Sequence, residues 1–100
     1  MMTKLLVVDD DDSIRTSLEN YLCRNGYEVV LAQDGNEALA VARKNRPDLV
    51  VLDVMLPGMN GYECCRRLKE IDPALPVIFL SAKGDIVDKA TGFGQGGDDY

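Results

Sequence analysis

Residues 49–61 read LVVLDVMLPGMNG, and this stretch decides the fold. It begins with Leu49 to Leu52, an unbroken apolar run of the length expected for a buried strand. Asp53 is a lone charge between this run and a second apolar stretch, and a buried carboxylate needs a partner. Pro57 to Gly61 predict a turn that leads into a helix of about ten residues. The stretch therefore predicts a strand that delivers one carboxylate to a loop.

The same alternation of strand and helix extends in both directions from this stretch. Apolar runs rich in β-branched residues predict further strands at 5–8, 28–32 and 76–80. Apolar residues at helical spacing predict helices between the strands, which end at Asn25-Gly26, Arg46-Pro47 and Asp72-Pro73. A further short helix is expected at 85–90. Strands that alternate with helices at such short spacing predict an α/β domain, in which a doubly wound parallel sheet carries helices on both faces.

Two of the predicted helices carry recognisable start signals. Ser13 is expected to cap the first helix, and Asp34 followed by Glu37 resembles a capping box at the start of the second. The apolar positions of the first helix are Ile14, Leu18, Tyr21 and Leu22. Their spacing predicts an amphipathic helix.

Composition excludes several classes of function. The 100 residues fit one domain, and seventeen acidic against eleven basic side chains give a net charge of −6, which disfavours direct binding to nucleic acid. The chain has no histidine, which removes histidine-based acid–base catalysis and the commonest zinc ligand. Its three cysteines lack C-x-x-C spacing, and no signal peptide or membrane segment is predicted. A reducing cytoplasm is therefore the expected compartment, with buried or idle thiols.

Four polar residues follow three different predicted strands. Asp9 and Asp10 come after the first, Asp53 after the third and Ser81 after the fourth. In open α/β sheets ligands bind beyond the carboxyl ends of the strands, so these side chains are expected to converge. A carboxylate that follows a strand is often only a helix cap, and either a cap or simple solvation is the preferred interpretation of Asp11, Asp12 and Asp85. For Asp9 and Asp10 taken alone, cap and site are equally good interpretations.

The converging groups suit a hard metal ion and a phosphate. Clustered carboxylates repel one another unless a cation is present, and oxygen ligands favour Mg²⁺ or Mn²⁺. An aspartate carboxylate can act as a nucleophile toward phosphorus, and Asp53 is the best-placed acceptor. The Ser81 hydroxyl could donate to the same phosphate. Lys83 is interpreted as a solvated side chain, and Met55 and Met59 as packing residues rather than side-chain ligands.

Taken together, four blocks in this order closely resemble the receiver domain of bacterial two-component response regulators. They are Leu6-Val7-Val8-Asp9-Asp10, residues 52–61, Leu80-Ser81-Ala82-Lys83 and Gly97-Asp98-Asp99-Tyr100. The resemblance implies a flavodoxin-like fold with strand order 2-1-3-4-5. It also implies that residues 1–100 form a single receiver domain that lacks the family's fifth strand and fifth helix.

The resemblance implies a role for each site residue. Asp53 would accept a phosphoryl group from the phosphohistidine of a sensor histidine kinase. Asp10 and Asp53 would ligate Mg²⁺ together with the backbone carbonyl of Met55, and Asp9 would act through a water molecule on the metal. Ser81 would be the switch hydroxyl.

The resemblance further implies a cytoplasmic signalling domain rather than an enzyme with a small-molecule substrate. Phosphorylation would change the fourth-helix surface and so control an output domain, with a winged-helix DNA-binding domain as the expected type. Two alternatives stay open, namely a pseudo-receiver that only binds a partner and a metal-dependent phosphatase or phosphotransferase. Without a fifth strand, the strand at 76–80 would have an open edge, so dimerisation or strand exchange is also expected.

Overall fold

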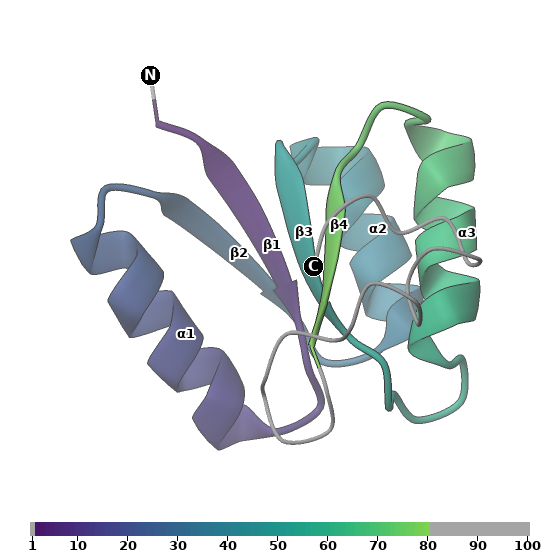
Figure 1. The fold of residues 1–100 in the computed structure, drawn as a ribbon, viewed down its shortest axis with the longest axis horizontal. Helices are drawn as coiled ribbons and strands as arrows, with labels where there is room; N and C mark the ends of the chain where they lie inside the picture. Colours follow the sequence, from purple (N-terminus) through teal and green to yellow (C-terminus); the bar gives the residue numbers. More distant parts are fainter. Residues whose placement is uncertain (1, 81–100) are drawn as a thin grey trace.

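The computed structural model describes residues 2–80 of the chain (Figure 1). Strands and helices alternate along these residues, and their bounds lie close to the predicted ones. In chain order the elements are β1 (Lys4–Val8), α1 (Asp12–Arg24), β2 (Glu28–Ala32), α2 (Gly35–Asn45), β3 (Leu49–Asp53), α3 (Gly61–Ile71) and β4 (Val77–Leu80). The short helix predicted at 85–90 and the predicted fourth-helix surface lie outside the described residues.

The strands form one parallel sheet in the order β2-β1-β3-β4. In the register, Leu6 of β1 lies opposite Val30 of β2 and Val50 of β3. Within the part of the chain that the structure describes, β4 pairs with β3 alone. The sheet confirms the predicted doubly wound α/β fold, whose strand order reverses between β1 and β3. Ligand sites in such sheets form at this reversal, beyond the carboxyl ends of the strands.

The helices cover the two faces of the sheet unequally. Figure 1 shows α1 on one side of the sheet and α2 and α3 on the other. The main core lies under α2 and α3, because alternate strand residues point to that face. Its fully buried members include Leu6, Val50, Leu52, Leu68 and Phe79. The larger core on this side fixes the positions of β1 and β3, which carry the acidic residues.

The opposite face is less tightly packed. Helix α1 has no buried residue, and a groove of about 460 Å³ opens on this side of the sheet. Its lining residues are Thr3, Leu5, Leu22, Tyr27, Asp48, Leu49, Val51 and Ile78. The amphipathic pattern of α1 is therefore confirmed only in part, because Tyr21 is 63% exposed while Leu18 and Leu22 are half-buried.

Each described helix begins at a polar side chain that accepts backbone hydrogen bonds. Asp11, not Ser13, is the N-cap of α1, and one of its carboxylate oxygens accepts from the backbone N–H groups of Ser13 and Ile14. The interpretation of Asp11 as a helix cap is therefore confirmed, whereas Ser13 is not the cap, because the helix begins almost directly after β1 and Asp11 is the extended residue that precedes it.

The second predicted cap is confirmed with one change. Asp34 caps α2 and accepts from the Glu37 N–H at 2.8 Å. The Glu37 carboxylate accepts from the Gln33 N–H at 2.7 Å. The capping box therefore closes one residue before the cap itself.

None of the described helices is long and apolar enough to span a membrane. Cys64 and Cys65 are buried thiols and Cys23 is an exposed one. Burial raises the pKa of the Cys64 thiol to about 12, so this thiol stays protonated at neutral pH.

Candidate functional site

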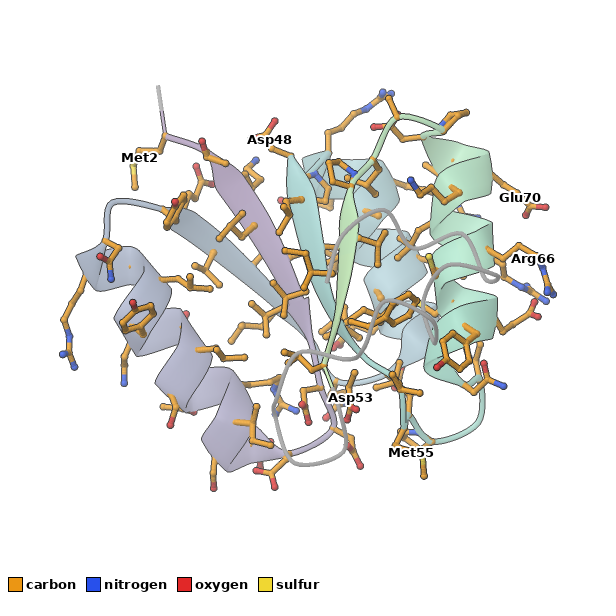
Figure 2. All side chains as sticks on the ribbon, viewed as in Figure 1. Met2, Asp48, Asp53, Met55, Arg66 and Glu70 are labelled. Carbon is orange, nitrogen blue, oxygen red and sulfur yellow. The ribbon has the colours of Figure 1, made fainter. Side chains whose placement is uncertain are left out.

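Three carboxylates meet at the carboxyl end of the sheet. One oxygen from each of Asp9, Asp10 and Asp53 lies within 4.8 Å of the other two. Asp9 is 1% exposed and Asp53 is 5% exposed, whereas Asp10 is open to solvent. Figure 2 shows Asp53 at this end of β3 and Asp48 at the opposite end. The structure thus brings together the three acids that follow two separate strands in the sequence.

The two buried carboxylates make the same local hydrogen bond. Asp9 Oδ1 accepts from the Asp11 N–H at 2.9 Å, and Asp53 Oδ1 accepts from the Met55 N–H at 3.0 Å. In each case the side chain bonds to the backbone two residues further on, as aspartates do in tight turns. These bonds fix both side chains in position while each strand turns into its loop.

The second oxygen of Asp9 is the feature that a helix cap does not explain. Asp9 Oδ2 is buried, and no donor among the described residues reaches it. A buried oxygen without a partner costs free energy, so such atoms in native proteins are usually satisfied by water or an ion. The cap of α1 is Asp11, which leaves Asp9 free for a site. The interpretation of Asp9 as a mere helix cap is therefore wrong.

Burial and mutual repulsion weaken the ionisation of both buried acids. Burial raises the pKa of Asp9, the hydrogen bond from Asp11 lowers it, and the charges of Asp10 and Asp11 raise it again. The pKa of Asp53 is also raised, mainly by burial and then by the charges of Asp9 and Asp10, against the hydrogen bond from Met55. A cation in the cluster would relieve the repulsion that these charges cause.

The residues present fit a hard divalent cation. All three donors are carboxylates, one oxygen from each lies within reach of a common point, and one buried oxygen has no partner among the described residues. Mg²⁺ takes one or two carboxylates and keeps several waters, so it needs one open side. The exposed position of Asp10 leaves that side open.

Of the two other predicted site residues, Met55 and Ser81, the structure describes only Met55. Met55 is the second residue after β3. Its N–H donates to Asp53 Oδ1, and its side chain is 65% exposed (Figure 2). Its side chain therefore does not pack as predicted, because the loop turns it outward, whereas Met59 packs against the core. Ser81 and Lys83 lie outside the described residues.

Two further residues at this end of the sheet were not identified from the sequence. Arg15 Nη1 donates to the backbone carbonyl of Asp9 at 2.7 Å, and its guanidinium also pairs with Asp12. The three-residue spacing of Asp12 and Arg15 could have indicated the ion pair, but not the contact with Asp9. Gly61 lies so close to β3 that a Cβ on it would be 2.4 Å from the Asp53 carbonyl oxygen.

Comparison with known proteins places this site in a family. Residues 5–100 match the response regulator receiver domain. The chain belongs to this family. It is 50% identical over 99 residues to the transcriptional regulatory protein AfsQ1 of Streptomyces coelicolor, which covers 99% of the chain and 44% of AfsQ1. It is 48% identical over 100 residues to the alkaline phosphatase synthesis transcriptional regulatory protein PhoP of Bacillus subtilis, which covers the whole chain and 42% of PhoP.

Solved structures show the same fold. The crystal structure of a putative response regulator from Chloroflexus aurantiacus superposes with a TM-score of 0.88 at 44% identity. That match covers all of this chain and 84% of the other. The receiver domain is the phosphoacceptor signalling module of two-component response regulators, and this chain spans less than half the length of the curated relatives named above.

Proposed function

We propose that Asp53 accepts a phosphoryl group in a magnesium-dependent reaction. The observation that carries this proposal is the position of the Asp53 carboxylate, which is almost fully buried and lies within 4.8 Å of two further carboxylates at the sheet's reversal point. An Asp53 oxygen would attack the phosphorus atom of a phosphohistidine or a small acyl phosphate. A new P–O bond forms, the bond to the donor breaks, and the donor keeps the electron pair.

Each residue of the site has a distinct task in this proposal. Asp10 and Asp53 would hold Mg²⁺ together with the Met55 carbonyl, and Asp9 would contact it through water. The bound ion offsets negative charge on the phosphoryl oxygens. The Met55 N–H fixes one Asp53 oxygen at 3.0 Å, so the side chain is oriented before any donor arrives.

The biological setting follows from the relatives and is part of the proposal. The donor would be a sensor histidine kinase, because the chain belongs to the receiver family of response regulators. The names of AfsQ1 and PhoP support a transcriptional output domain. Ser81 would act as the switch hydroxyl, and the chain would catalyse only its own phosphorylation and dephosphorylation. Cysteine side chains in the thiol form suit a cytoplasmic location.

Incubation with acetyl phosphate and Mg²⁺, read on a phosphate-affinity gel, tests the proposal. We expect a shifted band that disappears with EDTA and in Asp53→Asn. Asp48→Asn is the matched control, because Asp48 lies at the other end of the same strand (Figure 2) and should leave the band unchanged. A band that persists in Asp53→Asn would refute the assignment.

The same gel, together with a phosphate-release assay, separates the two alternative functions. A pseudo-receiver would give no band with acetyl phosphate or with a phosphorylated kinase. A small-molecule phosphatase would release phosphate over many turnovers from a simple ester, which the proposed switch would not do.

A further inference from the structure

Arg15 is a partly buried cation beside the acidic site. It lies in the second turn of α1, a helix in which no residue is fully buried, yet its side chain is only 15% exposed. Nη1 donates to the backbone carbonyl of Asp9 at 2.7 Å, and the guanidinium also pairs with Asp12, which is 87% exposed. Arg15 therefore connects the first turns of α1 to the end of β1.

The contact with Asp9 acts on Asp10 through the backbone. The Asp9 carbonyl and the Asp10 amide belong to one planar peptide unit, so a bond that fixes the carbonyl also fixes the plane from which Asp10 starts. The Asp9–Asp11 turn is also held by a second hydrogen bond, in which the Asp11 N–H donates to Asp9 Oδ1. Asp10 is the exposed acid of the cluster. The peptide that joins Asp9 to Asp10 is held by the Arg15 side chain of α1.

Two effects of Arg15 on cation binding oppose each other. Its positive charge repels a cation, so its removal would tighten binding if charge dominated. Its hydrogen bond holds the ligand loop in place, so its removal would weaken binding if position dominated. Asp12 pairs with the guanidinium and offsets part of its charge, but it does not donate to the Asp9 carbonyl, so position should dominate.

We propose that Arg15 is a positioning residue for the divalent cation, because its guanidinium holds the Asp9 peptide and thereby sets the direction of the Asp10 carboxylate. This inference rests on the proposed magnesium-dependent function of the same site. It goes further by naming a residue of α1 that is not among the proposed ligands of the metal or the phosphoryl group.

The test is a titration with Mn²⁺ alone, in which electron paramagnetic resonance measures Mn²⁺ binding. The titration is repeated with Mg²⁺ as competitor. In Arg15→Gln we expect the dissociation constant to rise roughly ten-fold, as for other groups that orient metal ligands. Arg66→Gln is the matched control, since Arg66 forms the same i,i+3 ion pair with Glu63 on α3, away from the site (Figure 2). It should leave the dissociation constant unchanged.

A purely structural role is separated by measuring unfolding of the metal-free variants. Arg15→Gln should lose affinity even where it is as folded as Arg66→Gln. If Arg15→Gln does not fold, Arg15→Lys decides the matter. Lysine keeps the charge but lacks the planar fork that spans Asp9 and Asp12, so we expect a rise of about three-fold.

Two results would overturn the inference. Unchanged or tighter Mn²⁺ affinity in Arg15→Gln would show that Arg15 does not position the site. If Arg15→Gln does not fold, unchanged Mn²⁺ affinity in Arg15→Lys would show the same. Asp10→Asn tells this failure apart from failure of the proposed function. If Asp10→Asn also binds Mn²⁺ normally, the proposed metal site is refuted. If Asp10→Asn binds Mn²⁺ weakly and the Arg15 variants bind it normally, only the role of Arg15 is refuted.

Discussion

Burial gives Asp9 and Asp53 properties that an exposed aspartate lacks. Both carboxylates are removed from solvent next to a third, so each resists ionisation and attracts a cation. In both, one carboxylate oxygen also accepts a hydrogen bond from the backbone N–H two residues further along the chain. The site is thus oriented by its own loops before a ligand binds, at the expense of stability in the metal-free protein.

The cost of burying the Asp53 carboxylate predicts how Asp53→Asn changes the free energy of unfolding. The pKa of Asp53 is raised in the folded protein above its ordinary value of 3.8, so the unfolded chain releases its proton at lower pH than the folded one. The free energy of unfolding in EDTA should therefore fall as pH rises above 3.8 through the raised pKa. Asp53→Asn keeps the bond from Met55 and should be more stable at pH 7 by about 1 kcal/mol.

Urea denaturation in EDTA across this pH range checks the prediction. The unsubstituted protein should lose stability on the way to neutral pH, and the Asp53→Asn curve should be flatter. Equal or lower stability of Asp53→Asn at pH 7 would mean that the buried charge is already compensated.

At the scale of elements, the start of α3 is packed directly on the end of β3. The Gly61 N–H donates to the Val54 carbonyl at 2.9 Å, and a Cβ on Gly61 would lie 2.4 Å from the Asp53 carbonyl oxygen and 2.7 Å from Val54 Cα. These neighbours are backbone atoms, which cannot rotate away. The helix and the strand that carries Asp53 therefore form one rigid unit.

Gly61→Ala should disrupt this unit. The added methyl group must push α3 away from the strand, and we expect a loss of about 3 kcal/mol in unfolding free energy, at the upper end for overpacking. Weaker Mn²⁺ binding should accompany this loss, since the backbone of Asp53 is displaced. Gly26→Ala is the control: Gly26 has φ +91° but open space around it, so a cost of about 1 kcal/mol with normal metal binding is expected.

The sequence was sufficient for the order of the elements and for the three acids, because both depend on local patterns. Apolar runs mark the strands, and each acid directly follows one of them. The contacts of Arg15 and Gly61 could not be predicted, since they depend on how α1 and α3 approach the strand ends. Both Asp11 and Ser13 were candidate caps of α1, because a run of four aspartates before a serine offers several caps at once, and only the backbone shows that Asp11 is used.

At the scale of the whole molecule, part of the net charge of −6 is concentrated at one end of the sheet. A cation that binds only the folded state stabilises it by mass action. We expect Mg²⁺ at ten times its dissociation constant to add about 1.4 kcal/mol to the free energy of unfolding. The gain should be absent in Asp10→Asn, and thermal unfolding with and without Mg²⁺ checks both. An equal gain in Asp10→Asn would mean that Mg²⁺ acts elsewhere on the acidic surface.

Asp53 as the phosphoryl acceptor is tested most directly by chemical mapping of the modified residue. The protein is phosphorylated with acetyl phosphate and Mg²⁺ and then treated with borohydride, which reduces an aspartyl phosphate to homoserine. Peptide mass spectrometry should find homoserine at position 53, and nowhere else in the acidic cluster. Homoserine at position 9 or 10, or no reduction at position 53 in a protein that carries the phosphoryl group, would contradict the assignment.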